Sequence, residues 1–268
     1  MKISKLLGTL FCLLFVQNIA LAQIKPTVQS YPKETPKSAA FIGNSFFYFN
    51  NGIISNLAPM VAEGVKGSPW RQSMITISGS GFDWHDVDSY FRPNAIGKYS
   101  FDAQNNVVIN PAQKPLFDVS ILMDCSQCPI HPQMKSVFTE YAKKHSDTVR
   151  RHGSVPVFFM SWAYKDKPDM TLPLADAYTS AGNDNGVLVI PVGLAFAKSI
   201  ALKPDLELYA PDKRHPSAAG TYLSAATTYA ALFNRSPVGL KYSAGLNPEV
   251  ALFLQQVAYD TVKEYQKP

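Results

Sequence analysis

The chain has 268 residues, of which 46% are hydrophobic and 17% are charged. It is long enough for one sizeable domain and too apolar for a disordered protein. The net charge is +5, but the lysines and arginines are scattered along the sequence and do not cluster on one predicted element. This distribution argues against a nucleic-acid-binding protein.

The N-terminus is typical of a cleaved secretory signal. Two lysines precede an apolar run over residues 6–16, and Ala20-Leu21-Ala22 follows that run. We therefore assign residues 1–22 to a signal peptide and expect a secreted or periplasmic protein. No cysteine follows the small residues to indicate a lipid anchor, and no later apolar run is long enough for a membrane span.

Residues 23–37 contain three prolines among lysine, threonine and serine, a composition that favours an extended tether. The domain itself is expected to cover residues 38–268. Short apolar runs with the β-branched and aromatic content of strands recur along it, at residues 39–43, 73–78, 117–123, 155–161 and 186–192.

Helical patterns separate several of these runs, at residues 134–141, 194–202 and 222–230, with a last helix after Pro248. Strands that alternate with helices predict a three-layer α/β/α domain with a mainly parallel five-stranded sheet. Residues 101–111 are expected to form an inserted hairpin. The three histidines at 131, 145 and 152 fall on or beside one predicted helix and are expected to be solvated.

Polar residues follow the first three apolar runs, where ligands of an open parallel sheet bind. Gly43-Asn44-Ser45 follows the first run, the segment SGSGFDWH (78–85) the second, and the segment CSQC (125–128) the third. Taken alone, Asn44 or Ser45 would be an ordinary cap of the next helix.

A second polar pattern lies far downstream, where Asp212 precedes His215 by three residues just before a predicted helix. A serine hydroxyl is a poor nucleophile until an imidazole takes its proton, and a carboxylate fixes the tautomer of that imidazole. We therefore predict Ser45 as a nucleophile, His215 as its general base and Asp212 as the carboxylate that orients His215.

These segments resemble the SGNH/GDSL hydrolase superfamily, and specifically its branch that begins Gly-Asn-Ser-Phe. The resemblance implies a flavodoxin-like fold and a serine esterase without a metal or an organic cofactor. It also implies an O-acyl ester substrate, for example an O-acetyl ester, on a small molecule or a carbohydrate. The matching residues are Gly43, Asn44 (where many members have Asp), Ser45 and Phe46 in the first block, and Asp212, His215, Pro216, Ser217, Gly220, Tyr222 and Leu223 in the last.

The resemblance also suggests donors for the oxyanion that forms during acyl transfer. It places the glycine N–H at Gly79, with Gly81 as the alternative, and a side-chain amide at Gln127. Here the chain departs from the family, which usually has Gly and Asn where Cys125 and Gln127 stand. His85 is expected to be either a structural histidine or a second imidazole in the cleft.

Two other interpretations stay open. The CSQC segment is consistent with a small disulfide, with simple packing, with a thiol–disulfide oxidoreductase centre, or with zinc ligation together with His131. The departure in the third block leaves a catalytically inactive glycan-binding protein as the alternative to an exported esterase. The acyl group, the alcohol part of the substrate and the oligomeric state are not specified by the sequence.

Overall fold

The computed structural model describes residues 24–67, 69–110 and 114–267. The predicted signal peptide, residues 1–22, lies outside this part of the chain. The elements in chain order are β1 (Ser38–Gly43), α1 (Ser45–Tyr48), α2 (Gly52–Gly64), β2 (Arg71–Thr76), η1 (Phe82–Trp84), α3 (Val87–Tyr90), β3 (Tyr99–Phe101), β4 (Val107–Ile109), β5 (Val119–Leu122), α4 (Lys135–Arg151), β6 (Val155–Phe159), η2 (Pro168–Met170), α5 (Thr171–Asn185), β7 (Leu188–Ile190), α6 (Val192–Leu202), α7 (Ala218–Phe233) and α8 (Pro248–Tyr265).

Five parallel strands form the central sheet in the order β2-β1-β5-β6-β7. This confirms the predicted three-layer α/β/α domain. Every residue of β1, β5, β6 and β7 is buried, as expected of parallel strands that are covered on both faces, whereas the edge strand β2 is half-buried. Among the described helices, none is both long enough and apolar enough to cross a membrane.

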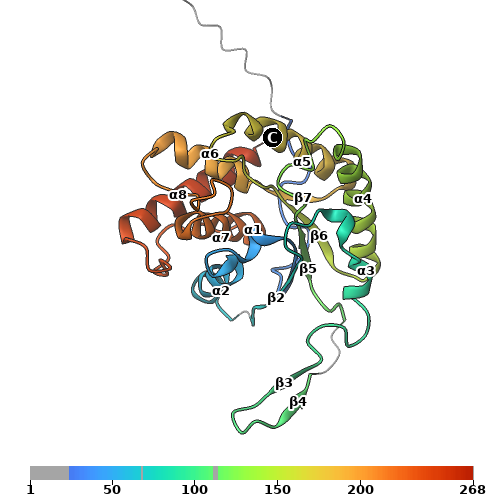
Figure 1. Ribbon diagram of the computed structural model, residues 1–268. Coiled ribbons are helices and arrows are strands. Elements are labelled where there is room, and N and C mark those ends of the chain that lie inside the picture. Colours follow the sequence, from blue (N-terminus) through green and yellow to red (C-terminus); the bar gives the residue numbers. More distant parts are fainter. Residues whose placement is uncertain (1–23, 68, 111–113, 268) are drawn as a thin grey trace, which may run out of the picture.

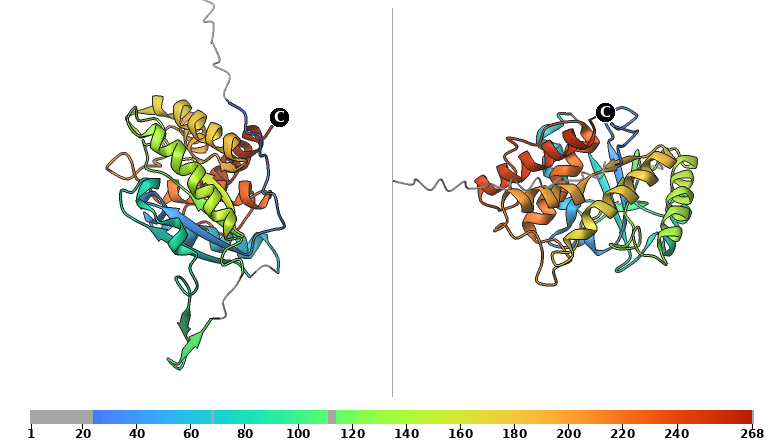
Figure 2. Two further views of the ribbon diagram at one scale, coloured as in Figure 1. Left: turned by 90° about the vertical axis from the view of Figure 1, so that its right-hand side faces the viewer. Right: turned by 90° about the horizontal axis from the view of Figure 1, so that it is seen from above.

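The chain winds in two directions from the centre of the sheet. From β1 it moves to β2, and it then returns to the other side of β1 for β5, β6 and β7. Right-handed crossovers place the two sets of helices on opposite faces: α2, α6, α7 and α8 pack together on one, and α4 and α5 on the other (Figures 1 and 2). The direction changes between β1 and β5, so a ligand site is expected beyond the carboxyl ends of these two strands.

The predicted inserted hairpin is confirmed, with slightly different bounds. Strands β3 and β4 pair antiparallel and project away from the body of the domain (Figures 1 and 2). The pairing places four large side chains on one face of the hairpin, and each is 57–63% exposed: Tyr99, Phe101, Val107 and Ile109.

Residues 24–37, the described part of the predicted tether, contain no helix or strand but are held against the domain. The N–H of Thr27 donates to Asn183 Oδ1 at 2.7 Å, and the N–H of Lys37 donates to Asp118 Oδ2 at 2.7 Å. The hydroxyl of Tyr31 donates to the Asp118 carbonyl oxygen at 3.1 Å. Side chains of the domain thus accept hydrogen bonds from backbone N–H groups of this segment, which belongs to no helix or sheet.

The expectation of a solvated His145 was wrong. His145 is 2% exposed, and its Nε2 lies 2.8 Å from the carbonyl oxygen of Phe82. It follows Phe138 by two helical turns and therefore shares the buried face of α4. Burial lowers the pKa of His145, although the bond to the Phe82 carbonyl acts in the opposite direction.

Candidate active site

The turn after β1 positions Ser45 at the carboxyl end of the sheet. Asn44 is the N-cap of α1, and its Oδ1 accepts the N–H of Phe46 at 3.2 Å. A Cβ atom at Gly43 would lie 2.9 Å from the Phe47 ring and 3.2 Å from the Met123 carbonyl oxygen, so only glycine fits there. Ser45 opens the helix and is 9% exposed.

Ser45, His215 and Asp212 form one continuous hydrogen-bonded chain, although 170 positions separate Ser45 from His215. His215 Nε2 lies 2.8 Å from Ser45 Oγ, and His215 Nδ1 is hydrogen-bonded to Asp212 Oδ2. The other oxygen of Asp212 accepts the backbone N–H groups of Arg214 and His215, each at 3.0 Å. The arrangement can transfer a proton from the serine hydroxyl to a histidine that a carboxylate holds in place.

Asp212 is an anion at neutral pH. Burial raises its pKa, but the hydrogen bonds from the His215 side chain and from the backbone N–H groups of Arg214 and His215 outweigh burial and lower the pKa to about 2. The ionised carboxylate accepts a proton-bearing Nδ1, so this network assigns the free Nε2 lone pair of a neutral His215 to Ser45.

Backbone bonds fix the loop that carries Asp212 and His215. Trp162 Nε1 donates to the Arg214 carbonyl oxygen at 2.9 Å, and the His215 carbonyl oxygen accepts the N–H of Ala210 at 2.8 Å. Ser217 then caps α7 by accepting the N–H of Gly220 at 3.2 Å. A Cβ at Gly220 would lie 2.3 Å from the Leu208 carbonyl oxygen, which explains glycine at this position of the last block.

Asn44 joins the nucleophile turn to the two loops where oxyanion donors are predicted. Its Nδ2 donates to the carbonyl oxygen of Ser80 at 3.0 Å and to that of Asp124 at 3.1 Å. The sequence suggested only a cap, or a substitute for the usual Asp. The presence of an amide at this position was the available sign of this bridging role, because an Asp carboxylate cannot donate to two carbonyl groups.

The two candidate oxyanion glycines both lie on the loop that follows β2. Gly79 is exposed, has a φ of +73°, and has open space where a Cβ would stand. Gly81 is buried, and a Cβ there would lie 2.8 Å from Asp83 Oδ1 and 3.0 Å from Asp124 Oδ1. Gly81 therefore permits a close approach between two loops, whereas Gly79 is on the open side of its loop.

His85 supports this loop and does not contact Ser45 in the described structure. It is 4% exposed, its Nε2 lies 3.0 Å from Ser80 Oγ and 3.1 Å from the Gly43 carbonyl oxygen, and its Nδ1 lies 3.0 Å from the Tyr90 hydroxyl. Burial outweighs the bond to Gly43 and lowers the pKa of His85 to about 4. Of the two roles expected for His85, these contacts match the structural one.

The third loop contains a disulfide between Cys125 and Cys128. Across the described residues, no group of three His, Cys, Asp or Glu side chains is arranged to hold a metal ion, so the suggested zinc set is not assembled. Gln127 Nε2 contacts Met170 Sδ at 3.7 Å. Among the residues that the structure describes, no hydrogen bond joins Gln127 to Ser45 or His215. The structure thus does not bring Gln127 into the hydrogen-bonded chain.

Asp124 supports the site in a role that the sequence analysis did not assign to it. It is 2% exposed, and its Oδ1 accepts the N–H of Phe82 at 2.6 Å and that of Cys125 at 2.8 Å, while its Oδ2 has no partner among the described residues. Burial raises the pKa of Asp124 to about 6 against the effect of these bonds. An acidic residue directly after a buried strand was the available signal.

The fold of this chain is similar to that of several solved structures, some of which are described as SGNH or GDSL-like hydrolases. One is a DUF4886 family protein from Bacteroides uniformis, with a TM-score of 0.57 and 17% identity over 86% of this chain and 96% of that chain. Another is a provisionally assigned SGNH hydrolase from Slackia heliotrinireducens, with a TM-score of 0.51 and 22% identity over 70% of this chain and 94% of that chain.

A third is a provisionally assigned GDSL-like lipase from Parabacteroides merdae, with a TM-score of 0.54 and 13% identity over 80% of this chain and all of that chain. No family model matches the sequence, and no curated protein matches it either. At these identities the similarity establishes the fold.

Proposed function

We propose that this chain is an exported ester hydrolase in which Ser45 is the nucleophile, His215 the general base and Asp212 the residue that orients His215. The observation that supports this most is the unbroken hydrogen-bonded chain from Asp212 through His215 to Ser45 Oγ. It lies at the carboxyl end of β1, next to the point where the winding of the sheet changes direction.

The reaction proceeds in two balanced steps. Ser45 Oγ attacks the ester carbonyl carbon while His215 Nε2 takes the hydroxyl proton, and His215 then gives that proton to the departing alkoxide, which leaves as the alcohol. In the second step, His215 Nε2 takes a proton from a water molecule that attacks the acyl carbon, and it gives this proton back to Ser45 Oγ as the carboxylic acid leaves. The oxyanion of each tetrahedral intermediate accepts hydrogen bonds from the N–H groups of Ser45 and Gly79 and from the Gln127 amide.

The substrate that we propose is an O-acyl ester on a carbohydrate, with acetyl as the first candidate. The resemblance to the Gly-Asn-Ser-Phe branch supports this choice. Exposed aromatic side chains on the segments that follow β1 and β2 also support it, because flat ring faces pack against the C–H faces of sugars. Tyr48 is 39% exposed at the end of α1, three residues after Ser45, and Trp84 is 60% exposed at the end of η1.

Labelling with a fluorophosphonate probe, together with turnover of p-nitrophenyl acetate and of an acetylated polysaccharide, tests this function. Ser45→Ala should abolish labelling, and Ser45→Ala and His215→Ala should each lower kcat about 10³-fold or more in a folded protein. Ser100→Ala, on the exposed hairpin, is the matched control and should leave both readouts unchanged.

Two results would contradict the proposal. Turnover near the wild-type level in Ser45→Ala would show that another group performs the hydrolysis. A folded wild-type protein that binds the acetylated polysaccharide but neither reacts with the probe nor releases acetate would indicate the alternative, a glycan-binding protein.

A further inference from the structure

The imidazole of His215 lies between two phenylalanine rings from the nucleophile segment. The Phe49 ring is stacked on it, with the centroids 4.0 Å apart and the planes at 17°. The Phe46 ring meets it edge to face at 5.4 Å and 75°. Phe46 is buried and is itself stacked on Trp162, with centroids 4.5 Å apart. Phe49 is half-buried, so the stack on His215 has one side near solvent.

The backbone after Phe49 is strained. Asn50, Asn51 and Gly52 have φ values of 47°, 65° and 72°, three consecutive residues in the left-handed region. Asparagine and glycine are the residues that tolerate this region best, yet such runs persist only where the surrounding structure enforces them. Strain in this turn therefore indicates that the position of Phe49 is fixed from outside the turn.

The enforcing contacts come from the chain next to His215. The Asn50 side-chain amide donates to the carbonyl oxygen of Pro216, the residue that follows His215. The Thr221 hydroxyl donates to the Phe49 carbonyl oxygen at 3.3 Å. At its other end, the N–H of Phe49 donates to the Ser45 carbonyl oxygen at 3.0 Å. Phe49 is thus tied to both the nucleophile and the loop of the general base.

We propose that Phe49 is a positioning residue for His215, a role that rests on the function proposed above. Both nitrogens of the imidazole are in use, one toward Asp212 and one toward Ser45, so a rotation of the ring about its bond to Cβ breaks both bonds. Such a rotation drives the edge of the imidazole into the Phe49 ring. Phe49 therefore holds the plane in which proton transfer is possible, and misplacement by about 1 Å can cost about 100-fold in rate.

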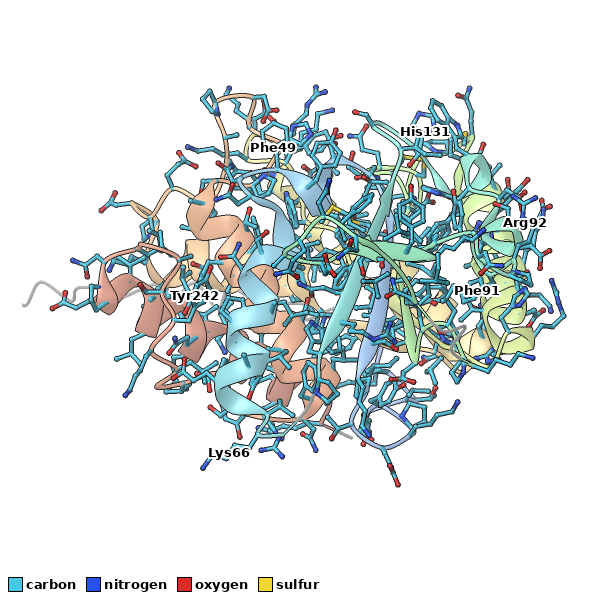
Figure 3. All side chains as sticks on the ribbon, turned by 90° about the horizontal axis from the view of Figure 1, so that it is seen from below. Phe49, Lys66, Phe91, Arg92, His131 and Tyr242 are labelled. Atoms are coloured by element: carbon cyan, nitrogen blue, oxygen red, sulfur yellow. A yellow bond between two sulfur atoms is a disulfide. The ribbon has the colours of Figure 1, made fainter. Side chains whose placement is uncertain are left out.

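The chain contains a matched control for this contact. Phe91 is stacked on His152 with centroids 4.8 Å apart and planes at 5°, and Phe91 is 8% exposed. Figure 3 shows Phe49 and Phe91 in well-separated parts of the molecule. Phe91→Leu removes the same kind of ring stack outside the candidate active site. Because Phe91 is more buried than Phe49, Phe91→Leu loses at least as much buried area as Phe49→Leu.

The experiment compares Phe49→Leu, Phe49→Tyr and Phe91→Leu in ester turnover and in the rate of fluorophosphonate labelling. Phe49→Leu should lower kcat and the labelling rate about 10-fold or more, with KM within about 2-fold, because the contact acts on proton transfer and not on binding. Phe49→Tyr keeps the ring and should stay within about 3-fold of the wild type, and Phe91→Leu within about 2-fold.

The contact from Thr221 supplies a second arm. Thr221→Val preserves the shape of this buried residue and removes its hydrogen bond to Phe49, and it should lower kcat about 3-fold. In the double variant with Phe49→Leu, the loss should be smaller than the product of the single losses, because both changes release the same ring. Losses that multiply would overturn the idea that the segment acts as one unit.

Two further results would overturn the role of Phe49. One is a wild-type kcat and labelling rate in Phe49→Leu, and the other is a raised KM with unchanged kcat, which would make Phe49 a substrate contact. Ser45→Ala, measured in parallel, separates the two proposals. Activity that survives in Ser45→Ala overturns the hydrolase mechanism and this role with it, whereas its loss there and its retention in Phe49→Leu overturn the role of Phe49 alone.

Discussion

The side-chain amide of Gln127, the predicted oxyanion donor, is held only weakly. Its Nε2 contacts a thioether sulfur, a poor acceptor that a developing oxyanion can readily replace. Because such a donor acts mainly in the transition state, Gln127→Ala should lower kcat about 100-fold with little change in KM. Gln127→Asn should recover part of this loss. Steady-state kinetics on p-nitrophenyl acetate measure both effects.

Turnover at the wild-type level in Gln127→Ala would contradict this role. The oxyanion would then depend on the N–H groups of Ser45 and Gly79 alone, or on a neighbour of Gln127 in the loop closed by the disulfide.

Asn44 allows a second test at the scale of a single residue, because Asn44 is 4% exposed and its side-chain amide donates two hydrogen bonds. Asn44→Asp, which restores the residue common in the family, would remove both donors and turn a carboxylate toward two carbonyl oxygens. We expect a loss of about 2–4 kcal/mol in the free energy of unfolding at pH 7, measured by urea denaturation. Asn51→Asp is the control, because the exposed Asn51 side chain makes no capping hydrogen bond to α2. Equal stability of the two variants would show that the two donations contribute little.

At the scale of elements, two buried ionisable groups on neighbouring loops give opposite pH dependences. The pKa of Asp124 rises from 3.8 to about 6 on folding, so its contribution to stability is present at low pH and is lost as the pH rises through 6. The pKa of His85 falls from 6.5 to about 4, so its contribution is present at neutral pH and is lost as the pH falls from 6.5 through 4. Between pH 4 and 6 the two effects largely cancel.

Asp124→Asn should therefore expose the response of His85, to which His145 adds in the same direction because burial lowers its pKa as well. The amide oxygen can still accept the N–H groups of Phe82 and Cys125, while the titration of residue 124 disappears. Relative to the wild type, the free energy of unfolding should rise at pH 7 and should fall more steeply on acidification, by about 3 kcal/mol between pH 6.5 and 4. Urea denaturation at four pH values in this window measures the difference. Parallel pH profiles for the wild type and the variant would contradict the raised pKa of Asp124.

For the whole molecule, the projecting hairpin is expected to be dispensable for folding. Its large side chains are mostly exposed, and the N–H of Asn110 already donates to the Lys98 carbonyl oxygen at 2.9 Å, at the base of the hairpin. Replacing residues 99–109 by Asn-Gly, which suits a two-residue turn, should leave Tm within about 3 °C and p-nitrophenyl acetate turnover unchanged. A much larger loss of Tm would show that the hairpin supports the domain in a way that its exposure does not reveal.

Contiguous sequence was sufficient to predict the five strands of the sheet, the helices α4, α6, α7 and α8, and the polar strand ends, but not α2 or α5. A parallel sheet buried on both faces requires apolar runs, and the runs that end at Gly43 and near Asp124 could be read directly because burial acts on neighbouring residues alike. The spacing of Asp212 and His215 was also informative, because a single turn holds both residues. The sequence thus predicted the fold and proposed the three residues of the hydrogen-bonded chain.

The tertiary structure decided which groups support that chain. His145 was predicted to be solvated and is buried, because the face of α4 toward the sheet depends on what packs there. Asn44, Asp124 and Phe49 owe their contacts to partners 36 to 172 positions away, and no local pattern encodes such distances. Periodicity and turn chemistry are properties of adjacent residues, whereas burial, pKa and ring stacking are properties of the space in which distant segments meet.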